Sequence, residues 1–203
     1  SYVTATTGND SLTITGASNT AHLGDGANTT TISGTGTGNN VTTGAGNDTF
    51  TVAGDTNTIN TGAGVNNVTV SAGADSNIVN GGSGDDTLNI AGNLNSANAG
   101  AGNNTIGVSG NTNNITATTG NDNLTVSGIN NTANLGDGTN ISTISGTGTG
   151  NTISTGTGND TFTVAGDTNT INTGDGTNSV TVAAGADSNI VNGGSGDDTL
   201  NIA

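Results

Sequence analysis

The sequence has 203 residues, but only 28% of them are hydrophobic, against about 45–50% in ordinary globular domains. It contains no Lys, Arg, Pro, Cys, Met or Trp, and its 15 acidic residues, all Asp, give a net charge of −15. This composition excludes a membrane span, a disulfide framework and a basic nucleic-acid surface. We also expect no enzyme, because Lys, Arg, Glu and Cys are absent and His22 is the single histidine.

Internal repetition is the strongest feature of the sequence. Residues 5–91 align without gaps to residues 117–203, and only 17 of these 87 positions differ. Within each 112-residue block a coil of 18 or 20 residues recurs, and coils start at residues 5, 23, 43, 61, 81, 99, 117, 135, 155, 173 and 193. We therefore expect one continuous solenoid over residues 1–203, with a first super-repeat at 5–116 and a second, incomplete one at 117–203. The chain begins without Met and stops within a coil, which indicates a piece of a longer, uncapped array.

The sequence of each coil predicts two short strands and two turns, as residues 43–60 illustrate. The Gly-rich stretch 43–47 predicts a turn, and Phe50 and Val52 then alternate with Thr49 and Thr51, which is the period of a strand. A second turn follows at 53–55, and residues 57–60 form a second strand that places Ile59 inward. The fold class is therefore all-β, a parallel β-solenoid (β-roll) of stacked 18–20-residue coils. Eleven coils about 4.8 Å apart make a rod of roughly 50 Å.

Charge is the weakness of such a stack. Aligned coils place Asp residues above one another, and two charges 5–10 Å apart repel by ~2–3 kcal/mol at an effective dielectric constant of about 20. The sequence offers no Lys or Arg to compensate. A bound cation is therefore the expected missing component.

The stretch Gly81–Asn89 matches the nonapeptide G-G-x-G-x-D-x-U-x at every fixed position. In this respect the chain resembles the RTX (repeats-in-toxin) calcium-binding β-roll family. The TGxGND form at 43–48 and 155–160 is also similar to calcium-bound solenoid repeats of giant bacterial surface adhesins, including an ice-binding one. The resemblance implies Ca²⁺ as the cofactor, held between neighbouring coils by turn carbonyls and by the sixth-position carboxylates. The matching residues are Asp10, Asp48, Asp86, Asp122, Asp160 and Asp198.

The chain departs from the family pattern in two respects. The sixth position alternates strictly between Asp and Asn, so that Asn66 and Asn104 are weaker candidate ligands. The other edge of the coil lacks the G-G-x-G-x-D turn, and we expect one good cation-binding edge and one weak or empty edge. Fewer charges per ion predict a dissociation constant of ~10⁻⁴–10⁻³ M. Some Asn coils carry an acid three places earlier that could compensate, namely Asp25, Asp137 and Asp175.

An alternative needs no metal: the Asp and Asn residues form the turns and stack as side-chain ladders. The absence of Lys and Arg favours calcium, because a metal-free solenoid usually interleaves both signs of charge.

The leading functional hypothesis is structural. We expect a secreted, extracellular or cell-surface segment of a calcium-rigidified fibre or filament, surface layer (S-layer) or giant adhesin, whose partners are copies of itself, head-to-tail or lateral. The resemblance implies export into a calcium-rich medium and folding there. The alternative is an ice- or glycan-binding face built from outward Thr pairs, Thr49 with Thr51 and Thr161 with Thr163.

Overall fold

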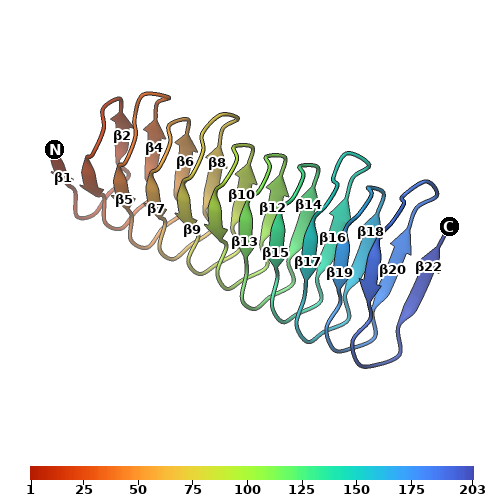
Figure 1. The fold of residues 1–203 in the computed structure, drawn as a ribbon. Coiled ribbons are helices and arrows are strands. Elements are labelled where there is room, and N and C mark those ends of the chain that lie inside the picture. Colours follow the sequence, from red (N-terminus) through yellow and green to blue (C-terminus); the bar gives the residue numbers. More distant parts are fainter.

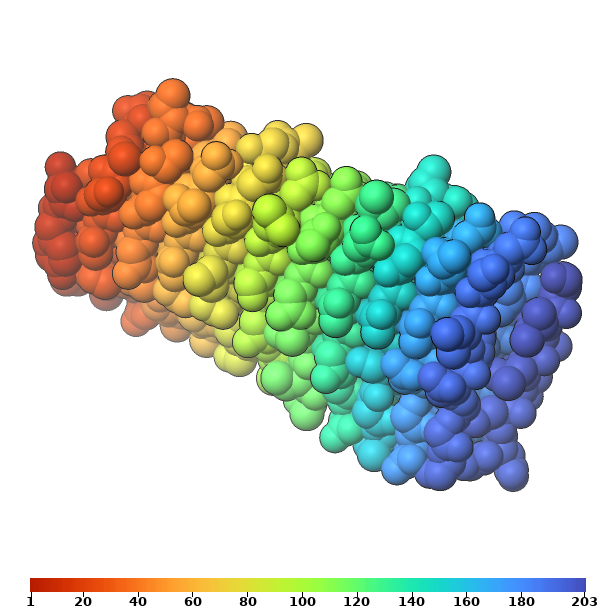
Figure 2. Space-filling model, viewed as in Figure 1, coloured from red at the N-terminus to blue at the C-terminus, as the bar shows by residue number.

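The computed structural model describes residues 1–203 as an elongated solenoid of two parallel β-sheets without any helix (Figure 1). Alternation of apolar and polar residues produces the strands, and Gly-rich turns separate them, as the sequence predicts. None of the elements is a helix that could cross a membrane. The colour bands in Figure 2 follow one another along the long axis, so that each coil contacts only the coils before and after it.

The first sheet contains the three-residue strands and is called the short-strand sheet. Its eleven strands pair in the order β1-β3-β5-β7-β9-β11-β13-β15-β17-β19-β21. Their bounds are β1 Tyr2–Thr4, β3 Thr20–His22, β5 Asn40–Thr42, β7 Thr58–Asn60, β9 Ile78–Asn80, β11 Ser96–Asn98, β13 Asn114–Thr116, β15 Thr132–Asn134, β17 Thr152–Ser154, β19 Thr170–Asn172 and β21 Ile190–Asn192.

The second sheet contains the four-residue strands and is called the long-strand sheet. Its order is β2-β4-β6-β8-β10-β12-β14-β16-β18-β20-β22. Their bounds are β2 Ser11–Ile14, β4 Thr29–Ile32, β6 Thr49–Val52, β8 Asn67–Val70, β10 Thr87–Ile90, β12 Thr105–Val108, β14 Asn123–Val126, β16 Ile141–Ile144, β18 Thr161–Val164, β20 Ser179–Val182 and β22 Thr199–Ile202.

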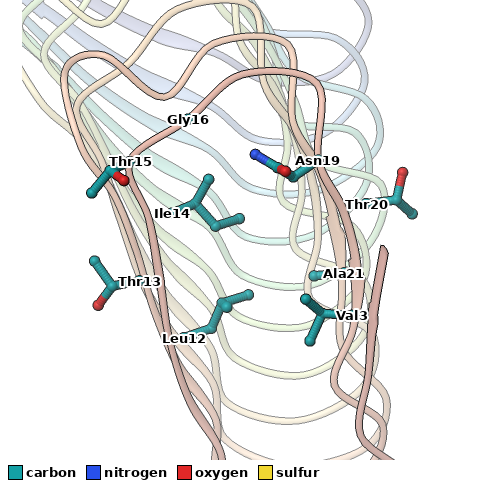
Figure 3. A pocket seen from close by; sticks show the side chains of 9 residues that line it. All are labelled: Val3, Leu12, Thr13, Ile14, Thr15, Gly16, Asn19, Thr20 and Ala21. Atoms are coloured by element: carbon teal, nitrogen blue, oxygen red, sulfur yellow. The ribbon is translucent and has the colours of Figure 1, made fainter. Parts of the chain in front are cut away.

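Equivalent residues of successive coils lie in register, which confirms the repeat deduced from the sequence. Phe50 pairs with Val68, and Val41 pairs with Ile59. The two sheets enclose one continuous core of 30 buried hydrophobic residues. Most coils contribute two positions of the long strand and one of the short strand, as Phe50, Val52 and Ile59 illustrate. Figure 3 shows this arrangement at the N-terminal end, where Leu12 and Ile14 point inward and Thr13 points outward.

Two edges connect the sheets. The glycine edge (residues 5–10, 23–28, 43–48 and their equivalents) leads from a short strand into a long strand. The asparagine edge (residues 15–19, 33–39, 53–57 and their equivalents) leads back. The four 20-residue coils carry their two extra residues on the asparagine edge, at 33–39, 71–77, 145–151 and 183–189, and these turns rise above their neighbours in Figure 1.

Candidate metal centre

The sixth position of every coil forms a ladder along the glycine edge. The N–H of Asn66 donates to Asp86 Oδ1 at 2.8 Å, the N–H of Asp86 donates to Asn104 Oδ1 at 3.0 Å, and the N–H of Asn104 donates to Asp122 Oδ1 at 2.8 Å. The same contact joins every pair of neighbouring coils from Asp10 to Asp198. The six candidate ligands therefore alternate with Asn along one line. The four interior ones, Asp48, Asp86, Asp122 and Asp160, are each 1% exposed.

One oxygen of the interior carboxylates has no partner. Oδ2 of Asp48, Asp86, Asp122 and Asp160 is buried without any hydrogen bond, and the same holds for Asp10 Oδ2. Burial raises the pKa of Asp86 to about 6, and burial also raises the pKa of Asp122. An ionised buried carboxylate without a compensating partner is costly, so these positions require a proton or a cation.

Glycine allows the main-chain carbonyls of successive coils to lie close together on this edge. Gly84 has a φ of 122°, and a Cβ at this residue would lie 2.1 Å from the Gly64 carbonyl oxygen of the preceding coil. A side chain would therefore separate the coils at the fourth position. Because this turn carries no side chain there, main-chain carbonyls of successive coils stack closely beside the Asp carboxylates.

The donor set suits a hard cation. Nowhere are three His or Asp side chains grouped as a metal cluster, so each Asp turn offers a single buried carboxylate together with main-chain carbonyls. Calcium accepts carboxylate and carbonyl oxygens at flexible angles. The orphaned Oδ2 atoms and the glycine turns therefore fit Ca²⁺.

The weaker acidic candidates lie elsewhere on the turns. Asp25, Asp137 and Asp175 are exposed at the third position, one residue before the carbonyls described above. Asp25 Oδ1 accepts the N–H of Ala45 at 2.7 Å, and Asp137 Oδ1 accepts the N–H of Thr157 at 2.8 Å. The Thr157 N–H lowers the pKa of Asp137. Asp25 and Asp137 thus accept a backbone N–H of the next coil, whereas Asp175 accepts the Ser195 hydroxyl.

The sequence analysis missed a second ladder on the asparagine edge. The N–H of Asn95 donates to Asn113 Oδ1 at 2.7 Å, and Asn113 Nδ2 donates to the Gly92 carbonyl at 3.0 Å. Equivalent contacts are made by Asn39, Asn57, Asn77, Asn131, Asn151 and Asn169. Only Asn occupies this position in ten coils, from Asn19 to Asn189, and that invariance was the available signal. On this edge the buried ladder consists of neutral amides, while the carboxylates of Asp55, Asp75 and Asp167 accept further N–H groups of the next coil.

The outward Thr pairs are exposed on the long-strand sheet. Thr49 and Thr51 lie in β6, whereas Thr161 and Thr163 lie in β18, six coils further along. Asn67 and Ile141 interrupt the first row between them, and Gly107 interrupts the second. The structure therefore presents two short Thr patches and does not bring the four residues together.

The chain matches the family model of the RTX calcium-binding nonapeptide repeat. The match comprises four copies, at residues 33–68, 65–88, 145–180 and 181–201. These segments cover more than half of the sequence and include Asp48, Asp86, Asp160 and Asp198. No curated protein matches the sequence. Repeats of this kind bind Ca²⁺ and are typical of secreted bacterial proteins. The nonapeptide pattern, the parallel solenoid and the carbonyl-rich glycine edge agree, and the chain belongs to the RTX calcium-binding nonapeptide repeat family.

Proposed function

We propose that this chain is a non-enzymatic extracellular segment of a calcium-rigidified fibre, surface layer or giant adhesin. The buried Oδ2 atoms of Asp48, Asp86, Asp122 and Asp160, which have no protein partner, carry this proposal. They create a demand for positive charge inside the fold that a chain without Lys or Arg cannot meet itself. Extracellular calcium would meet this demand, and its binding would stabilise the folded state by mass action.

The proposed calcium ligands are Asp10, Asp48, Asp86, Asp122, Asp160 and Asp198, with carbonyls of the glycine edge. Bound calcium supplies positive charge and coordination between coils. The chain's own contribution is to hold each Oδ1 in the ladder, which orients Oδ2 toward the turn. The rod then supplies length and stiffness. Copies of the chain would associate head-to-tail or laterally in such a fibre.

The direct test is far-UV circular dichroism and thermal melting of the chain during calcium titration. We expect the melting temperature to rise with calcium between about 0.1 and 10 mM, the range of affinity of extracellular calcium modules. An equimolar magnesium titration is the control, because Mg²⁺ demands near-octahedral geometry and dehydrates reluctantly. A melting curve identical in chelator and in 10 mM calcium would refute the proposal.

The second candidate function is ice or glycan binding on the long-strand sheet. The exposed Thr49–Thr51 and Thr161–Thr163 pairs support it, since they form flat outward patches. Thermal hysteresis or glycan-array binding by the calcium-loaded chain, lost in a Thr49→Lys/Thr161→Lys variant, would favour this function over the structural one.

A further inference from the structure

Four of the five Asn turns of the glycine edge, all but that of Asn178, satisfy a carbonyl of their own turn. Asn140 Nδ2 donates to the Gly136 and Gly138 carbonyls of its own turn, both at 3.3 Å. Asn28 makes the same two contacts with the Gly24 and Gly26 carbonyls, at 3.2 and 3.1 Å. Asn66 and Asn104 donate to the fourth-position carbonyls of their turns, at 3.3 and 3.1 Å. Each of these amides therefore places a partial positive charge against the turn oxygens.

The Asp turns lack this donor. The Gly120 carbonyl, which is equivalent to that of Gly138, accepts no hydrogen bond from the protein, and the same is true of Gly84. In these turns an oxygen, Asp122 Oδ2 or Asp86 Oδ2, takes the place of the amide nitrogen, and it is buried and unpartnered. Unpaired carbonyl and carboxylate oxygens thus occur together in every second coil.

The exchange of Asn for Asp at the sixth position explains both the unpaired carbonyl and the unpaired carboxylate oxygen. Asp and Asn have the same shape, and their Oδ1 atoms make the same ladder contact: Asn104 N–H reaches Asp122 at 2.8 Å, and Asp122 N–H reaches Asn140 at 3.0 Å. The two residues differ only in the second terminal atom, which is an N–H donor in Asn and an oxygen in Asp.

We propose that calcium binds only at every second coil, because the side-chain amides of Asn28, Asn66, Asn104 and Asn140 take the place of ions. This inference rests on the proposed calcium function and specifies its stoichiometry. Asn66 and Asn104 then satisfy the turn carbonyls themselves and do not act as calcium ligands. The four interior Asp turns each bind one ion, and the terminal turns of Asp10 and Asp198 add at most two more, so the chain holds four to six ions rather than one per coil.

The test counts ions by anomalous difference density in crystals of the full chain grown with calcium, and by titration calorimetry. The first variant, Asp122→Asn, should lose one ion and melt at a higher temperature than the wild type in chelator, because the new amide satisfies the Gly120 carbonyl. The second variant, Asn140→Asp, should gain one ion and melt lower in chelator. The double variant Asp122→Asn/Asn140→Asp is the matched control, and its ion count should equal that of the wild type.

The possible results distinguish a failure of the alternation from a failure of calcium binding itself. Calcium at the Asp turns alone, with counts that follow the substitutions, supports both. Calcium at the Asn turns as well, or an unchanged count in Asp122→Asn, overturns the alternation but keeps calcium binding. Absence of calcium from every turn of the wild type refutes the proposed function and, with it, the alternation.

Discussion

Asn104 and Asp122 contact each other twice across neighbouring coils: the N–H and the Nδ2 of Asn104 both donate to Asp122 Oδ1 at 2.8 Å. The other carboxylate oxygen of Asp122 is buried and receives nothing. One side chain is thus both a satisfied structural acceptor and an unsatisfied charge. The Oδ1 contacts join the two coils, and the buried Oδ2 is the atom at which we expect a proton or a calcium ion.

The metal-free protein should become more stable on mild acidification. Burial raises the pKa of Asp86 to about 6 and raises that of Asp122. A group with a raised pKa in the folded state favours folding in its protonated form, and that advantage is lost as the pH rises through the folded-state pKa. Melting temperatures in chelator should therefore increase from pH 7 to pH 5.

The control for this pH effect is the double variant Asp86→Asn/Asp122→Asn, which should show a flatter profile over the same range. Asp137 has a lowered pKa, so its effect has the opposite sign and appears only below its ordinary titration range. A wild-type melting temperature that falls steadily between pH 7 and pH 5 in chelator would contradict the assignment.

Asn113→Ala should destabilise the protein whether or not calcium is present. The substitution removes the acceptor of the Asn95 N–H and the donor to the Gly92 carbonyl, both on the asparagine edge. Two lost bonds to buried groups cost about 2–4 kcal/mol. Urea denaturation with calcium and with chelator measures the loss, and exposed Asn114 offers a neutral Asn114→Ala control. Rescue of Asn113→Ala by calcium would show that this edge also binds the ion.

Thr30→Val should stabilise the core. Thr30 is 1% exposed in β4, and its hydroxyl has no hydrogen-bond partner. Valine has nearly the same volume and removes the unpaired polar group, which should add about 1–2 kcal/mol to the free energy of unfolding. Thermal and urea unfolding measure this gain. Thr30→Leu is the contrasting variant, because Thr30 pairs with the bulky Phe50 and a longer side chain would overpack the site. Equal stability of the Val and Leu variants would show that space is not limiting there.

Leu94→Gly should relieve backbone strain on the asparagine edge. Leu94 has a φ of 58° and an exposed side chain, whereas Gly38 and Gly150 occupy the equivalent place in other coils. Left-handed backbone costs a residue with a Cβ about 1–2 kcal/mol, part of which glycine returns as chain entropy. We expect a net gain of roughly 0.5–1 kcal/mol in urea denaturation. Leu94→Ala keeps the Cβ and should gain nothing; an equal gain in Ala would assign the effect to the loss of exposed apolar surface.

The sequence was sufficient to predict the two-strand coil and its register. Phe50, Val52 and Ile59 alternate with polar residues, and the 18- or 20-residue period brings equivalent positions into pairing. The parallel solenoid is therefore confirmed. The family match supports calcium as the cofactor, while the individual ligands remain predictions.

Edge chemistry was harder to predict because it depends on the neighbouring coil. Whether Asn113 only forms a turn or also holds the preceding coil is decided by the direction of its side chain, which the local sequence pattern does not reveal. The unpaired hydroxyl of Thr30 was hidden for a related reason. The coil register places Thr30 inward, beside Leu12 and Phe50, but whether its hydroxyl finds a partner depends on the side chains that surround it.

The 20-residue coils give the rod a periodic outline. The protruding turns at 71–77 and 183–189 lie six coils apart, and so do those at 33–39 and 145–151. With about 4.8 Å between coils, a pair of bumps recurs every ~29 Å along one side of the molecule. Fibre diffraction of aligned rods should therefore show a layer line at an axial spacing of ~29 Å, six times the spacing between strands, and micrographs should show the same period.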